Sequence, residues 1–261
     1  MSWWGKVVGG TFGFLIGGPL GALLGASLGH KLDASFSGGG LGGYLPGDQE
    51  RTQAAFFTAT FSVMGYIAKA DGQVSKHEIA LARKIMGEMQ LGDLQKKAAI
   101  ALFNTGKSED FDLSPVLLQF RKECHRRSTL LQMFLEIQVH AAFADGKLDP
   151  RENSALKDIA RQLGFRADDI EMIIEMIRAG GHAGPDSRAT KSVADPYKVL
   201  GVSADMPLPD IKKAYRRLLS QHHPDKLVSK GLPEEMIKLA NQKTHEIREA
   251  WKQIQETHKS S

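Results

Sequence analysis

The first apolar stretch of the chain runs from Val7 to Gly29 without a charged side chain. As one helix, these 23 residues would measure about 35 Å, enough to cross a hydrocarbon core of about 30 Å with some tilt. Trp3 and Trp4 precede the stretch, and such rings favour the membrane interface. Because a signal peptide has a shorter apolar core and a small-residue cleavage site, we predict a transmembrane helix over 7–29.

Glycine occupies every fourth position of this stretch, a spacing that follows a ridge on a helix surface. In lipid, helices associate through close backbone approach, and a glycine groove suits a right-handed crossing with a second copy. The sequence therefore predicts a homodimer with contacts at Gly9, Gly13, Gly17, Gly21 and Gly25. The alternative is that glycine merely lowers the hydrophobicity of the segment. Pro19 removes a backbone donor, so we expect a kink there.

Beyond a glycine-rich juxtamembrane linker over 30–49, apolar residues recur at a helical spacing of three or four over 50–179. No stretch alternates as a strand would, so the pattern predicts an all-α fold. A small, polar second linker over 180–194 leads to a charged segment over 195–261 with two helical stretches. The clearest helical runs are Phe57, Phe61, Met64, Ala68; Leu131, Leu135, Val139; and Ile170, Ile173, Ile174, Ile177.

A short sequence occurs twice in the middle region. AKADGQVSKHE at 68–78 and AFADGKLDPRE at 142–152 share the pattern A-D-G-x-(V/L)-x-x-x-E. The first copy contains S-x-x-E, which is typical of a capping box. In the second, Asp149, Pro150 and Glu152 fit an N-cap, a proline at the first helical position and an acid in the first turn. Each copy therefore predicts a turn that opens a helix.

The two aspartates of the repeat are less well explained by caps. Asp71 and Asp145 each stand seven residues before a glutamate, so the turns could bring four carboxylates together. A divalent cation bound by Asp71, Glu78, Asp145 and Glu152 is therefore an alternative to the favoured turn-and-cap role. The doubled pattern over roughly 50–180 resembles the tellurite-resistance TerB-like helical domain.

The net charge and the cysteine content limit the classes of function that the chain can have. The net charge of +4 is too small to indicate a nucleic-acid partner. Cys124 is the single cysteine, so no intrachain disulfide forms and the soluble part needs no oxidising compartment. A reactive thiol near cations is one interpretation of Cys124, and a small helix residue without chemistry is the favoured one.

The last segment predicts a helical hairpin. Its first helix begins at Pro209–Asp210 and ends at Gln221–His222, because Pro224 disfavours the helical conformation at His223. The second begins near Pro233, and a loop at the tip of the hairpin holds His223-Pro224-Asp225. The outer face of the first helix carries Lys212, Lys213, Arg216 and Arg217.

These residues suit the recognition of an acidic protein partner. Pro224 stiffens the loop, Asp225 can accept a charge-assisted bond from an arginine, and the four cations would steer an acidic surface. A solvated helix face is the alternative for the cations. No nucleophile stands beside a base, so we expect no enzymatic activity.

Four elements in order resemble the J domain of DnaJ-type co-chaperones: D-P-Y-K-V-L-G-V, A-Y-R-R-L-L, His223-Pro224-Asp225 and E-I-R-E-A-W. The resemblance implies that the tripeptide, Tyr215 and the basic helix contact a DnaK-type chaperone and accelerate its ATP hydrolysis. Trp251 replaces the more usual tyrosine of the family. The glycine/phenylalanine-rich stretch, CxxCxGxG repeats and C-terminal domain of full DnaJ are absent from the sequence, which puts general delivery of unfolded clients in doubt.

The anchor, the TerB-like middle and the J domain together resemble membrane-anchored DnaJ-like co-chaperones of Gram-negative bacteria. This implies that a DnaK-type chaperone is recruited, without a cofactor, to membrane or envelope-signalling clients at the inner membrane. Flanking charges do not set the orientation, but partner and ATP are cytosolic, so residues 1–6 are expected in the periplasm and the bulk of the chain in the cytoplasm. The alternative is a membrane-bound stress or metal sensor with the J domain as its output.

Overall fold

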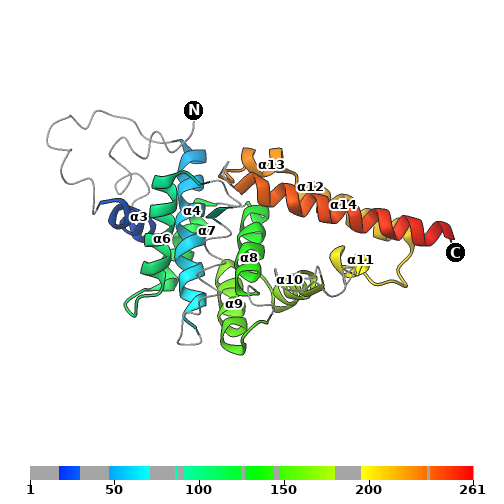
Figure 1. Cartoon of the computed structure of the whole chain (residues 1–261), viewed down its shortest axis with the longest axis horizontal. Helices are drawn as coiled ribbons and strands as arrows, with labels where there is room; N and C mark the ends of the chain where they lie inside the picture. The colour runs from blue at the N-terminus through cyan, green and yellow to red at the C-terminus, as the bar shows by residue number, and fades with distance from the viewer. Residues whose placement is uncertain are drawn as a thin grey trace.

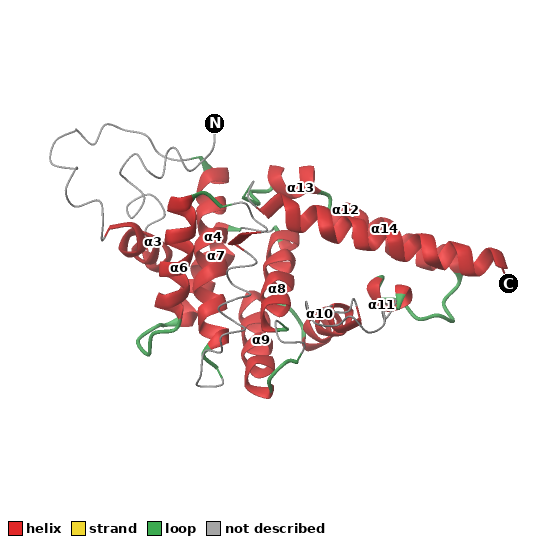
Figure 2. Ribbon diagram, viewed as in Figure 1, coloured by secondary structure: helices red, strands yellow, loops and turns green. Residues whose placement is uncertain are grey.

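The fold of the chain is helical throughout its described part (Figures 1 and 2). The computed structural model describes residues 18–29, 47–70, 86–87, 91–124, 127–143, 147–179, 195–233 and 236–260. Within these residues the predicted all-α class is confirmed. The helices are α3 (Gly18–Gly29), α4 (Asp48–Ala68), α6 (Asp93–Gly106), α7 (Leu113–Glu123), α8 (Ser128–Ala142), α9 (Pro150–Leu163), α10 (Ala167–Ala179), α11 (Pro196–Val199), α12 (Leu208–Gln221), α13 (Pro224–Ser229) and α14 (Ile237–Ser260).

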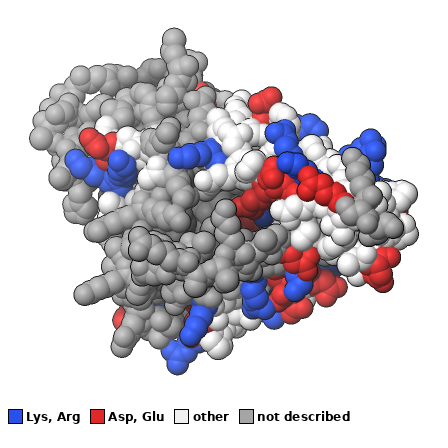
Figure 3. Space-filling view, turned by 45° about the vertical axis from the view of Figure 1, so that its right-hand side comes forward, with Lys and Arg blue, Asp and Glu red and all other residues white. Residues whose placement is uncertain are grey.

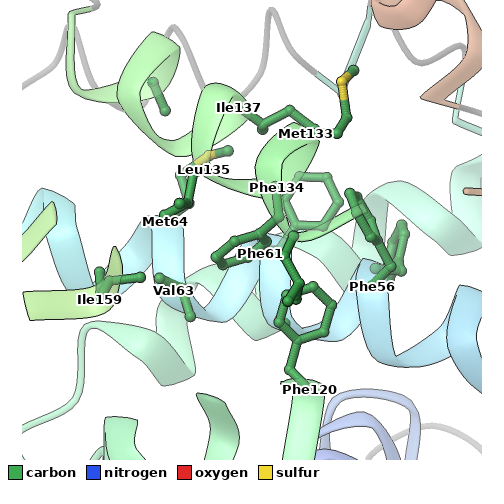
Figure 4. Close-up of a cluster of buried hydrophobic side chains, with 14 of the residues drawn as sticks. Phe56, Phe61, Val63, Met64, Phe120, Met133, Phe134, Leu135, Ile137 and Ile159 are labelled. Carbon is green, nitrogen blue, oxygen red and sulfur yellow. The ribbon is translucent and has the colours of Figure 1, made fainter. Parts of the chain in front are cut away.

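Helix α4 is the centre of the middle domain. It packs against α6, α7, α8 and α9, and most of its side chains are buried, as expected of a helix that is covered on every side. Phe56 of α4 lies edge-on to Phe120 of α7, with ring centroids 5.8 Å apart, and Phe120 contacts Phe134 of α8 at 4.7 Å (Figure 4). The helical runs predicted in this region are buried, as their spacing requires.

Helix α3 is the described part of the predicted membrane span, and it packs against α4, α6 and α7. Leu20 is fully buried, and its backbone N–H donates a 2.8 Å hydrogen bond to Oε1 of Gln119. Pro19 lies in the first turn of α3, where its missing N–H breaks no bond of this helix. The expected kink stays a prediction, because residues 7–17 lie outside the described part of the chain. Among the described residues, no helix has the length and apolar character needed to span a membrane; residues 7–17 lie outside this part.

The hairpin at the C-terminal end has a small core of its own. Residues of α11, α12 and α14 form it, and α12 ends at Gln221 as predicted. Tyr215 of α12 stacks on Trp251 of α14, with centroids 5.2 Å apart and ring planes 15° apart. The core residues are Val199, Leu200, Ile211, Leu218, Ile247, Ala250, Trp251 and Ile254.

The other end of the hairpin belongs to the core of the middle domain. Helix α13 and the first turn of α14 lie beside the upper end of α8 in Figure 1. The buried apolar side chains of this end join the cluster formed by α4 and α8 rather than that of the hairpin. These side chains are Leu227, Leu232, Met236 and Ala240. The C-terminal hairpin is therefore docked on the middle domain through this end.

Candidate partner-binding site

The His223-Pro224-Asp225 tripeptide forms the junction between two helices. His222 is the C-cap of α12, and His223, with φ −63° and ψ 122°, is the N-cap of α13. The extended backbone at His223 is what a following proline imposes, and Pro224 occupies the first helical position, where its missing N–H is not needed. The prediction of a loop at the tip of the hairpin is therefore wrong for Pro224 to Ser229, because a short helix begins inside the tripeptide.

The tripeptide stays open to solvent on its charged side. The side chain of Asp225 is 91% exposed and that of His223 is 42% exposed. His223 Nδ1 and Asp225 Oδ2 are 3.9 Å apart, too far for a hydrogen bond. His223 Nδ1 is itself buried without a hydrogen-bond partner. Among the described residues no donor bonds to the Asp225 carboxylate, which is therefore available to a donor from another molecule.

The basic face of α12 flanks the tripeptide. Its four cations are exposed, and within the described part of the chain none has a carboxylate oxygen within 4.0 Å. They are Lys212, Lys213, Arg216 and Arg217. Nearby, Lys226 donates a 2.6 Å hydrogen bond to Ser220 Oγ. On the face in Figure 3, acidic and basic groups lie beside one another in several places, in keeping with the small net charge.

Tyr215, which recurs with Ile211 and Leu218 at helical spacing, packs against the core of the hairpin. It is half-buried and stacks on Trp251, so it joins α12 to α14. Trp251 supplies a flat ring of sufficient size at this contact, which explains how the hairpin accepts the departure from the more usual tyrosine. A contact between Tyr215 and a partner stays a prediction.

The turn-and-cap role of the second repeat is confirmed. The backbone N–H of Asp149 donates to Glu152 Oε2 at 3.1 Å, and Asp149 Oδ1 accepts from the N–H of Arg151 at 2.7 Å. Glu152 is therefore engaged in the cap of α9. Asp71, Glu78 and Asp145 lie outside the described residues, and the described residues hold no cluster of three potential metal ligands.

The glycine stripe is described only at its end. Gly21 is buried in α3, on a helix that packs against the middle domain, and Gly25 lies further along the same helix. Gly9, Gly13 and Gly17 lie outside the described residues. The predicted dimer contact is therefore neither supported nor opposed by the fold.

Two buried residues near the site did not emerge from the sequence. His222 has 3% of its side chain exposed, and its Nε2 lies 3.5 Å from Oε1 of Glu136 in α8, whose side chain is 9% exposed. The separation exceeds that of an ordinary hydrogen bond, and the contact is an ion pair only when the imidazole is protonated. The burial of His222 could have been predicted, because His222 stands four residues after Leu218 and so shares the buried face of α12. No local pattern marks Glu136 as its neighbour.

Cys124 lies at the end of α7 and is fully buried. Burial raises the pKa of its thiol far above the ordinary value, while the nearby Arg127 lowers it only in part. Because the thiolate is the reactive form, the small-residue interpretation of Cys124 holds and the reactive one does not.

Family models match three consecutive parts of the chain: Co-chaperone DjlA transmembrane domain over 1–50, Tellurite resistance protein TerB over 57–175 and DnaJ domain over 195–260. Co-chaperone protein DjlA of Photobacterium profundum is 43% identical over 269 residues, 96% of this chain and 97% of the relative. The protein of the same name from Photorhabdus laumondii is 41% identical over 264 residues, 96% of each chain. That from Coxiella burnetii is 44% identical over 210 residues, 78% of each. No solved structure matches the chain significantly.

Proposed function

The chain belongs to the DjlA co-chaperone family, and from this membership we propose that its J domain binds a DnaK-type chaperone and stimulates the ATPase of that partner. The observation that carries the proposal is the free charge around the tripeptide. Asp225 is 91% exposed, and among the described residues no carboxylate oxygen lies within 4.0 Å of the cations of α12. Charged groups that the fold leaves unpaired serve to attract and orient a complementary surface.

The tripeptide is the centre of the proposed contact. Pro224 fixes the backbone at the start of α13, so little conformational entropy is lost when a partner binds. Asp225 offers both carboxylate oxygens to an arginine of the partner, and the cations of α12 face acidic residues beside it. The chain acts as a regulator in this scheme, and the partner hydrolyses the ATP.

The protein is membrane-anchored through its N-terminal domain, the region matched by the DjlA transmembrane model over 1–50. The finer topology is part of the proposal. Because a DnaK-type partner and its ATP are cytosolic, the J domain lies in the cytoplasm, residues 1–6 lie in the periplasm and the membrane is the inner one. Protease added outside spheroplasts is expected to leave the C-terminal domain intact, and its digestion would reverse this orientation.

The anchor also sets which clients the partner meets. A J domain tethered to the bilayer raises the local concentration of the chaperone at membrane-proximal and envelope-signalling proteins. Two anchors paired through the glycine stripe would place two J domains at one point. The sensor alternative is not favoured, since the relatives that span most of the chain are co-chaperones.

The test measures the steady-state ATPase rate of a DnaK-type chaperone against the concentration of the full chain in detergent. We expect the wild type to raise the rate and His223→Gln to abolish the increase. His258→Gln is the matched control, because His258 is exposed on α14, 14 residues beyond Thr244, whose hydroxyl donates to the carbonyl of His222. An equal increase with His223→Gln and with wild type would refute the proposed function.

A further inference from the structure

Side chains of the middle domain hold the backbone just beyond the tripeptide. Arg127 Nη1 donates to the carbonyl oxygen of Lys230 at 2.6 Å and to Thr52 Oγ1 at 3.0 Å. In return, Nζ of Lys230 donates to Thr129 Oγ1 at 2.9 Å. Gln49 Nε2 adds a 3.3 Å bond to the carbonyl of Val228. Residues on α4, at the start of α8 and just before it thus bind the end of α13.

The apolar part of this contact permits little sliding. Leu232 and Met236 are fully buried in the cluster of the middle domain. Gly231 has φ +100°, and a Cβ at this position would lie 2.8 Å from Cγ2 of Thr52. The chain therefore approaches α4 in a conformation and at a distance that favour glycine. Closely packed surfaces of this kind fix one orientation of the two domains.

A buried polar pair lies directly before the tripeptide. His222 faces Glu136, with 3.5 Å between Nε2 and Oε1. Gln132 donates to the same oxygen of Glu136 at 3.0 Å, and Thr244 Oγ1 donates to the carbonyl of His222 at 3.0 Å. One end of the His-Pro-Asp turn, at Lys230, is therefore hydrogen-bonded to the middle domain, and the other end, at His222, lies against Glu136 of that domain.

Docking leaves the charged side of the turn free. Asp225 and the cations of α12 are exposed in the docked arrangement, and His223 is partly exposed. An autoinhibitory contact would cover these groups. The contact with the middle domain instead covers the opposite side of α13. Holding a binding element in its bound orientation lowers the entropy lost on association.

We propose that Arg127 and Glu136 of the middle domain are positioning residues, which hold the His-Pro-Asp turn in the orientation that meets the ATPase partner. The inference rests on the proposed function and extends it to residues outside the J domain. The middle domain is then part of the stimulating unit.

The test compares full-chain variants in the ATPase titration and separates the concentration for half-maximal stimulation from the maximal rate. Arg127→Ala is expected to raise the half-maximal concentration about three- to tenfold while the maximal rate is kept, because only the preorganisation is lost. Arg127→Lys, which retains a cation and a donor, restores part of the effect. Hydrogen exchange at residues 222–233 is expected to be faster in Arg127→Ala than in wild type.

Arg121→Ala is the matched control, because Arg121 donates to the carbonyl of Gln162 at 3.3 Å within the middle domain. If circular dichroism shows that Arg127→Ala is unfolded, Thr129→Val and Glu136→Gln are measured instead in the same ATPase titration and judged by the same criteria. Stimulation equal to that of Arg121→Ala, or stronger, overturns the positioning role. His223→Gln in the same series distinguishes the two claims: if it stimulates normally, the proposed function itself fails.

Discussion

Gly106 of α6 lies directly against the backbone carbonyl of Ser62 in α4, so close that a Cβ at position 106 would overlap that oxygen. Gly65 of α4 stands in the same relation to the carbonyl of Phe103 in α6. The two helices thus cross with their backbones in contact at two points. Glycine is the residue that permits such an approach.

Replacing Gly106 by alanine is expected to destabilise the middle domain by about 1–3 kcal/mol, since the helices must separate or the backbone must shift. Urea unfolding followed by circular dichroism measures the change. Gly87→Ala is the control, because a Cβ at Gly87 meets no described residue within 4 Å and alanine favours a helix. Equal effects of the two substitutions would contradict the close crossing.

Substitutions in the cap of α9 distinguish a structural role of Glu152 from a role as a metal ligand. Asp149→Ala removes the acceptor for the N–H of Arg151, so a loss of about 1 kcal/mol is expected in urea unfolding. Glu152→Gln preserves an acceptor for the N–H of Asp149 and is expected to change stability little. Calorimetric titration of wild type and Glu152→Gln with Mg²⁺, Ca²⁺ and Zn²⁺ is the second measurement. Cation binding that disappears in Glu152→Gln would restore the metal role.

Cys124 is expected to be inert in the native protein. Burial raises the pKa of its thiol, so the thiolate is scarce at neutral pH and the sulfur is inaccessible. A thiol reagent such as a maleimide should react at pH 7 only after urea has unfolded the chain, and the rate should follow the unfolded fraction. Rapid labelling of the native protein would contradict this burial.

Local signals in the sequence predicted the ends of several helices. Pro224 predicts the end of α12 at Gln221, because the proline ring clashes with a helical backbone at the residue before it. Asp149 and Glu152 predict the start of α9, because their capping bonds also join residues that are close in sequence. The basic face of α12 was likewise predictable, since helical spacing alone brings its four cations together.

Contacts between distant segments could not be predicted in this way. Nothing near Glu136 in the chain specifies His222 as its neighbour, and the same holds for Gly106 and Ser62. The apolar character of 18–29 is compatible both with lipid and with the surface of α6 and α7, because both exclude water. Helix α13 was not predicted, because Pro224 was interpreted only as the end of one helix and it is also the first residue of the next.

The exposed cations of α12 are expected to control how fast the partner binds. Changing Arg216 and Arg217 to glutamine should lower the association rate with a DnaK-type chaperone and weaken its dependence on salt, with a smaller effect on dissociation. Surface plasmon resonance at two salt concentrations measures both rates. Lys252→Gln is the control, because Lys252 is an exposed cation on α14. An unchanged association rate would make the basic face an ordinary solvated surface.

Association of the anchor is expected to depend on the position of its glycines and not on their number. Gly9→Leu with Gly13→Leu fills the proposed groove, so self-association in a membrane two-hybrid assay should fall. Gly10→Leu with Thr11→Leu adds apolar side chains at neighbouring positions off the stripe and should leave association in place. Substitution at Gly21 is avoided, because Gly21 is buried in α3, which packs against the middle domain. If both pairs of substitutions leave association unchanged, glycine serves only to lower the hydrophobicity of the segment.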